Sequence, residues 1–188
     1  MENSPERQLK ADEIWFAVLF ATSMSALYVI LYRLSDFLAG NEAIGGVASV
    51  IFLPAFVRLL GFLVIRWWIV PALFVAGLFC VDLGLGIEAR IVVSIAIALG
   101  APVGICLAAR AMRLSSRLAG LNAMQLLWLS LGCAAGNALF YNAALAMVRP
   151  DHSAENFALE IFLGDAIGTW VMILLVKWLL TLSGRFRT

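Results

Sequence analysis

Four polar side chains lie inside long apolar runs of this sequence, and their types could support binding chemistry. Arg58 and Asp165 are ionisable, whereas Asn137 and Asn142 each carry an amide that both donates and accepts hydrogen bonds. An ionisable group surrounded by hydrocarbon is costly unless it faces an oppositely charged partner or a wet cavity. We therefore expect these residues to form a ligand-binding or partner-binding site, with Asp165 at its centre.

The depths of Arg58 and Asp165 decide whether the two charges can pair directly. At about 1.5 Å per residue, Arg58 lies roughly 20 Å from the outer start of its predicted helix. Asp165 lies only about 10 Å below the outer start of its own helix. A direct salt bridge therefore requires the helix that carries Arg58 to be broken or displaced at Pro54. In the alternative arrangement, Arg58 extends toward the inner surface and Asp165 caps an outer crevice.

The overall composition indicates the solvent in which these residues must be placed. Of 188 residues, 63% are hydrophobic and 13% are charged, and the mean hydropathy is +0.98. A water-soluble domain of this size could not bury so much apolar surface, so the lipid bilayer must surround the chain. The sequence therefore predicts a multi-pass membrane protein, which we place in a bacterial-type inner membrane.

Runs of about 20 apolar residues divide the chain into about six predicted membrane helices. Their bounds are Ile14–Leu34, Ile44–Ile65, Trp68–Leu85, Ile91–Ala109, Met124–Val148 and Phe157–Leu182. A polar linker, Ser35–Glu42, separates the first two. A cytoplasmic polar lead at residues 1–13 and a cytoplasmic tail at residues 183–188 flank the transmembrane domain of residues 14–182. The expected fold is an all-α polytopic bundle.

Lysine and arginine are retained on the cytoplasmic side of membranes, so their distribution predicts the orientation. With both termini inside, the cytoplasmic segments collect Arg7, Lys10, Arg66, Arg110, Arg113, Arg117, Lys177, Arg185 and Arg187, and the outer side holds Arg33, Arg90 and Arg149. The tryptophans that fall near the inner ends of their helices are Trp15, Trp67, Trp68, Trp128 and Trp178. Both patterns predict an N-in, C-in bundle.

Glycine pairs spaced four residues apart occur in the last three predicted helices. They are Gly100/Gly104, Gly132/Gly136 and Gly164/Gly168. Small residues at this spacing let the backbones of neighbouring helices approach closely. We expect these glycines to serve helix packing within the bundle, with a dimerisation face as the alternative.

Several classes of function find no support in the sequence. The cysteines, Cys80, Cys106 and Cys133, lie singly in apolar runs, without the paired spacing of a metal site or a disulfide framework. The one histidine, His152, falls in a predicted loop, and no constellation of nucleophile and base accompanies it. A net charge of +1 without a basic face argues against nucleic acid as a partner. We expect no enzyme activity, no catalytic residue, no metal and no cofactor.

Two short motifs stand out in the middle and near the end of the chain. The first comprises Leu53-Pro54-Ala55, Leu59-Leu60-Gly61, Trp67, Trp68, Pro71 and Gly77, and the second is Gly164-Asp165-Ala166-Ile167-Gly168. Together they resemble the integral membrane sensor domains of the MASE type. In that family a proline motif precedes an aliphatic helix, an aromatic turn and a proline-started helix, and a GD-x-x-G motif opens a late span. Such domains commonly have more than six spans and are joined to output domains, whereas this sequence ends at Thr188 without one.

The resemblance implies a non-enzymatic sensory or ligand-binding module that takes a small-molecule ligand and acts through a membrane or cytoplasmic partner protein. Two alternatives stay open. A substrate-capturing subunit of an energy-coupling-factor transporter has a similar size and six helices, and it would dock its partner through small-residue faces. An accessory subunit of a larger membrane complex would hold another membrane protein and need no ligand. The basic segment with Arg110, Arg113 and Arg117 could face a partner protein or anionic lipid headgroups.

Overall fold

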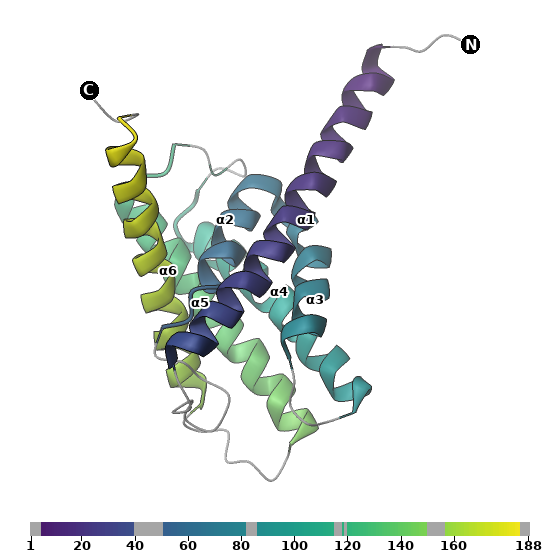
Figure 1. Cartoon of the computed structure of the whole chain (residues 1–188), viewed down its shortest axis with the longest axis vertical. Coiled ribbons are helices and arrows are strands. Elements are labelled where there is room, and N and C mark those ends of the chain that lie inside the picture. Colours follow the sequence, from purple (N-terminus) through teal and green to yellow (C-terminus); the bar gives the residue numbers. More distant parts are fainter. Residues whose placement is uncertain are drawn as a thin grey trace.

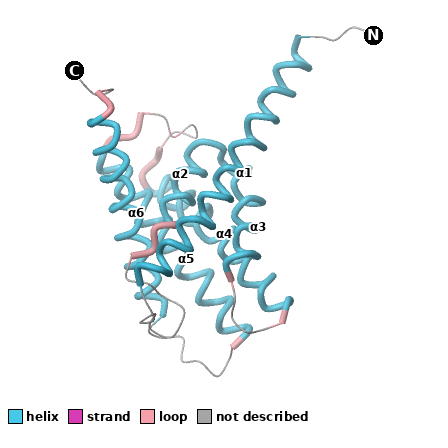
Figure 2. The backbone as a smooth tube through the Cα atoms, in the orientation of Figure 1, coloured by secondary structure: helices cyan, strands magenta, loops and turns pink. Residues whose placement is uncertain are grey.

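The computed structural model describes residues 5–39, 51–81, 86–114, 118, 120–149 and 157–184. Helices make up all of its regular elements in these ranges (Figure 2). They are α1 (Pro5–Ala39), α2 (Ala55–Ile65), the short 3-10 helix η2 (Arg66–Trp68), α3 (Ile69–Cys80), α4 (Ile87–Ala111), α5 (Ala123–Val148) and α6 (Phe157–Leu182). Within the described ranges, five helical stretches are long and apolar enough to cross a membrane. The prediction of an all-α, multi-pass membrane protein is confirmed at this level.

The helices alternate in direction, which brings the start of α1 and the end of α6 to one side of the bundle (Figure 1). In Figure 1, α1 begins and α6 ends at the same end of the molecule, called here the terminal end. Helix α5 runs antiparallel to α6, because Trp170 near the middle of α6 bonds Ser130 and Asp165 bonds Asn137. Helix α4 in turn runs antiparallel to α5 and ends at the terminal end.

Helix α1 is longer than the sequence predicts, at both of its ends. The expected bounds were Ile14–Leu34, but the helix runs from Pro5 to Ala39 and takes in part of the polar lead and part of the polar linker. Proline is well suited to the first position of a helix, and no further proline or glycine occurs before Gly40. Polar composition alone therefore does not end a helix here. The remainder of the linker, residues 40–42, lies outside the described residues.

The predicted second helix, Ile44–Ile65, is wrong at residues 51–54. Residues 44–50 lie outside the described residues, residues 51–54 are not helical, and α2 begins only at Ala55. Pro54 explains this start, because its ring disfavours helical backbone in the preceding residue and removes an amide donor. With 11 residues, α2 is about 16 Å long, roughly half of a hydrocarbon core. We call residues 51–54 the entry segment, since they lead the chain into α2.

The chain reverses direction between α2 and α3. Arg66 has φ 55° and ψ −131°, which breaks the helix, and the turn lies at the terminal end (Figure 1). A Cβ atom on Gly61 would lie only 2.5 Å from Ile69, a contact that a continuous helix could not make across eight residues. Helix α3 then ends at Cys80, before the predicted end at Leu85, and residues 82–85 lie outside the described residues.

Helices α4 and α5 pack with their backbones in direct contact. A Cβ atom on Gly100 would lie 2.8 Å from the carbonyl oxygen of Gly136, and one on Gly132 would lie 2.8 Å from that of Gly104. Cβ atoms on Gly104 or Gly136 would overlap the facing backbone. Two glycines on each helix therefore form one shared face, at which only glycine fits.

Candidate functional site

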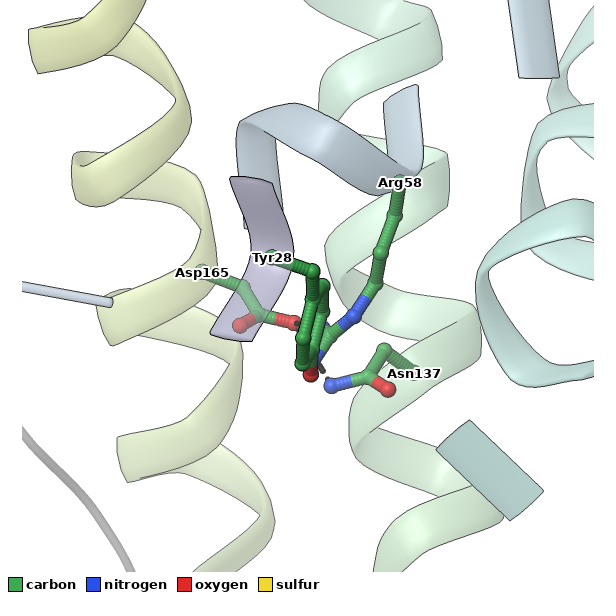
Figure 3. A network of polar contacts seen from close by, with 4 residues as sticks. All are labelled: Tyr28, Arg58, Asn137 and Asp165. Carbon is green, nitrogen blue, oxygen red and sulfur yellow. Dashed lines mark hydrogen bonds and ion pairs between the residues drawn. The ribbon is translucent and has the colours of Figure 1, made fainter. Parts of the chain in front are cut away.

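An ion pair lies in the interior of the bundle, between α2 and α6. The guanidinium nitrogen NH1 of Arg58 donates a hydrogen bond of 2.8 Å to Oδ2 of Asp165 (Figure 3). Both residues are only 2% exposed. The alternative in which Arg58 extends to the inner surface and Asp165 caps an outer crevice is therefore wrong, because the two charges pair with each other.

The break before α2 is what brings the two charges to the same depth. Arg58 is the fourth residue of α2, and the entry segment just before that helix contacts Gly164 and Gly168 on either side of Asp165. Arg58 therefore lies about one helical turn nearer the terminal end than the point at which the entry segment contacts α6. A full-length helix would have placed Arg58 much nearer the terminal end.

Two neutral side chains also form hydrogen bonds with the ion pair. Nδ2 of Asn137 on α5 donates 2.7 Å to the same Oδ2 of Asp165, and NH2 of Arg58 donates 2.7 Å to the hydroxyl of Tyr28 on α1. The amide nitrogen of Asn137 must face the carboxylate, since its oxygen would be repelled there. We call Tyr28, Arg58, Asn137 and Asp165 the ion-pair network. Figure 3 shows them converging from four separate helices.

Two aromatic rings lie close to the guanidinium of Arg58. The central carbon of Arg58 lies 5.4 Å from the ring centroid of Tyr28 and 5.1 Å from that of Phe52 in the entry segment. The two rings are themselves in edge contact, with centroids 6.4 Å apart. A cation in this position is stabilised by the negative faces of the rings. Phe52 therefore links the entry segment to the charge on α2.

The entry segment is irregular backbone inside a membrane bundle, so its polar groups need partners within the protein. The amide of Phe52 donates a hydrogen bond of 3.0 Å to the carbonyl oxygen of Gly164. The amide of Leu53 donates one of 3.0 Å to the hydroxyl of Ser35. A Cβ atom on Gly168 would overlap the backbone of Phe52. The segment is thereby fixed between α1 and α6, and Gly164 and Gly168 pack against it.

The ion-pair network leaves some of its hydrogen-bonding capacity unused. Among the residues that the structure describes, Nε of Arg58 has no acceptor and Oδ1 of Asn137 has no donor, although both atoms are buried. One spare donor and one spare acceptor therefore border the ion pair. A buried polar network that is only partly satisfied is costly, so these atoms favour the binding of a polar group or water.

Asn142 does not join the network. It lies further along α5, is partly buried, and its Oδ1 has no partner among the described residues. Conversely, sequence reasoning missed Tyr28 and Ser35. A signal for Tyr28 existed, because tyrosine in membrane helices is usually found at the interface and this one lies within a predicted span. Ser35 gave no such signal, since it was assigned to a polar linker.

The described residues give no indication of a metal site. Within them, no three His, Cys, Asp or Glu side chains are grouped closely enough to hold an ion. Cys80, Cys106 and Cys133 are free thiols. His152 and Arg117 lie outside the described part of the chain.

No protein family, no curated protein and no solved structure matches this chain.

Proposed function

We propose that this chain is a sensory or ligand-binding module of a bacterial-type inner membrane, which catalyses no reaction itself and passes its state to a partner protein. The likeness of its proline motif and its GD-x-x-G motif to MASE-type sensor domains supports this proposal. Those motifs correspond to the entry segment with α2 and to the part of α6 around Asp165.

The single observation that carries the proposal is the ion-pair network. A buried ion pair can often be replaced by well-packed apolar residues at no loss of stability, so stability alone does not account for it. An ionisable group within a membrane span is a candidate functional residue by default. Here the pair joins α2 to α6, and Tyr28 and Asn137 extend the connection to α1 and α5.

The network offers a direct way to couple binding to movement. A ligand with an anionic or hydrogen-bonding group could use the spare donor on Arg58, and a stronger acceptor there would compete with Asp165. Loss of the ion pair would free α2 from α6. Because α2 turns into α3 at the terminal end, a displacement of α2 would move this turn, which lies where we expect the partner to bind.

We further propose six membrane-embedded segments with both termini in the cytoplasm, of which α2 and α3 form a hairpin. The distribution of lysine and arginine supports this orientation. Single cysteines at Glu88 and Arg113, exposed positions near opposite ends of α4, should separate the two faces in a background without the native cysteines. A membrane-impermeant maleimide should label intact cells at Glu88→Cys and not at Arg113→Cys. The reverse labelling would overturn the orientation.

The glycine faces weigh against a transporter subunit that docks through small residues. The surfaces at Gly100 and Gly104 are covered by Gly132 and Gly136 of the same chain. The surface at Gly168 is covered by Phe52. These faces are therefore not available to a second protein. The alternative of an accessory subunit has no specific observation in its favour.

Native mass spectrometry after gentle extraction from the membrane tests the proposed function. The parent protein should retain a small molecule or a partner protein, and Asp165→Asn should lose it while remaining folded, since the asparagine oxygen can still accept from Arg58. Asp36→Asn, at an exposed position on α1, is the matched control and should behave like the parent. A parent protein that carries neither species, or an Asp165→Asn variant that retains it, would contradict the proposal.

A further inference from the structure

Arg66, at the turn between α2 and α3, has a backbone conformation that favours glycine. Its φ of 55° with ψ of −131° lies in a region that side chains with a Cβ atom rarely adopt. Such strain is retained where the surrounding structure or a function requires it. A glycine at this turn would adopt the same backbone conformation without strain, but it would lack the guanidinium. The guanidinium of Arg66 is therefore the feature that accounts for an arginine at this position.

The guanidinium of Arg66 is held in a fixed place by aromatic rings. Its central carbon lies 4.8 Å from the ring centroid of Phe62, a side chain that is fully buried. Phe62 in turn makes an edge contact with Trp67, with centroids 5.6 Å apart. The charge therefore stays at the turn and does not extend freely into solvent.

This fixed cation lacks an acceptor for one of its donors. The terminal nitrogen NH1 of Arg66 is buried and has no hydrogen-bond partner in the described part of the chain. Arg66 as a whole is only partly buried, so part of its side chain lies at the surface of the turn. A planar guanidinium with an unmet donor is well matched to the oxygens of a phosphate group.

The neighbours of Arg66 indicate where such a phosphate would come from. Trp67 and Trp68 are 50% and 55% exposed, on a turn at one end of a membrane bundle. Exposed indoles at this position lie at the level of the lipid headgroups. The same end of the molecule carries Arg110 and Arg113 at the end of α4, which makes it attractive to anionic lipid.

We propose that Arg66 binds the phosphate of an anionic phospholipid headgroup, with Trp67 and Trp68 lying in the headgroup layer beside it. The lipid is a specific ligand of the α2–α3 turn and not only part of the surrounding bilayer. This inference does not depend on the proposed sensory function, because it involves none of the residues of the ion-pair network.

Arg113 provides a matched control for the experiment. It is also an arginine with positive φ, 52°, at the same end of the molecule, but its side chain is exposed. Arg66→Gly and Arg113→Gly each remove one charge and each relieve a strained backbone. Native mass spectrometry of the full chain in detergent, titrated with phosphatidylglycerol or phosphatidylcholine, measures lipid retention for both variants.

The parent should retain phosphatidylglycerol in preference to phosphatidylcholine, and Arg66→Gly should weaken that retention roughly tenfold, the effect of one charge-assisted hydrogen bond. Arg113→Gly should retain phosphatidylglycerol like the parent. Equal losses in both variants would mean diffuse attraction by charge and would overturn the site. So would unchanged retention in Arg66→Gly.

A parallel titration separates a lipid from a soluble phosphate. Inorganic phosphate and glycerol phosphate at millimolar concentration should leave the bound phosphatidylglycerol in place, because only the lipid also contacts the apolar surface around the turn. Displacement by either compound would show that the site takes a free phosphate group and would overturn the lipid assignment. Arg66→Lys, which keeps the charge without the planar fork, should retain phosphatidylglycerol better than Arg66→Gly does.

Discussion

The α4–α5 interface and the surroundings of α2 solve the same problem of helix packing in opposite ways. Between α4 and α5, glycines let the backbones touch. Around α2, a shortened helix carries an arginine that must be matched by groups from α1, α5 and α6. The first arrangement holds the two helices together by close contact of their backbones. The second depends on a single ion pair, which another ligand could compete for, and this difference is why we place the function at α2.

The largest expected effect comes from removing one charge of the ion pair. Asp165→Leu leaves Arg58 buried without its counter-charge, which should lower the free energy of unfolding by about 3–5 kcal/mol. Chemical denaturation of the purified protein in detergent would measure this loss. Asp36→Leu, at an exposed position on α1, should be close to neutral. If both variants unfold like the parent, Arg58 has another partner than Asp165.

A smaller loss of stability is expected at the α4–α5 interface. Gly104→Ala places a Cβ atom against the carbonyl of Gly132, where neither backbone can move easily, and should cost about 1–3 kcal/mol. Gly86→Ala is the control, since a Cβ atom there meets nothing within 4 Å. Thermal unfolding in the same detergent would compare the two. Equal melting temperatures would show that α4 and α5 are not in close contact.

Much of the fold follows from the sequence, because long apolar runs and their charged ends are local features. The bounds of α6 agree with those predicted, and α5 begins one residue before its predicted start. The sequence also indicated that an Arg58–Asp165 pair would need a break at Pro54. It did not show whether the break occurs, because that depends on whether other parts of the chain satisfy the freed backbone groups.

The parts that could not be predicted depend on contacts between distant segments. Ser35 looked like a linker residue, yet its hydroxyl accepts a hydrogen bond from the amide of Leu53, 18 positions further along the chain. Tyr28 and Asn137 reach the ion pair from helices that neither charge belongs to. Asn142 has the same amide as Asn137, but its position on α5 does not bring it into the network. No local pattern distinguishes these two asparagines.

The smallest expected effect concerns the support of the entry segment. Ser35→Ala leaves the buried amide of Leu53 without its acceptor and should lower the free energy of unfolding by about 1 kcal/mol. Ser23→Ala on the same helix removes an exposed hydroxyl that bonds only the backbone of its own helix, and should change little. Denaturation midpoints would compare the two serines. A larger loss at Ser23 than at Ser35 would contradict the role given to the entry segment.

The central claim is that the ion-pair network serves binding and not stability, and one double variant tests it most directly. Arg58→Met with Asp165→Leu replaces both charges by apolar side chains, which should destabilise the protein less than Asp165→Leu alone, because no charge is left unpaired and only the neutral Asn137 and Tyr28 lose their partners. Measured by denaturation and native mass spectrometry on the same sample, this protein should fold and lose the small molecule or partner that the parent retains. A double variant that folds and still retains that species, or one that does not fold at all, would contradict the account.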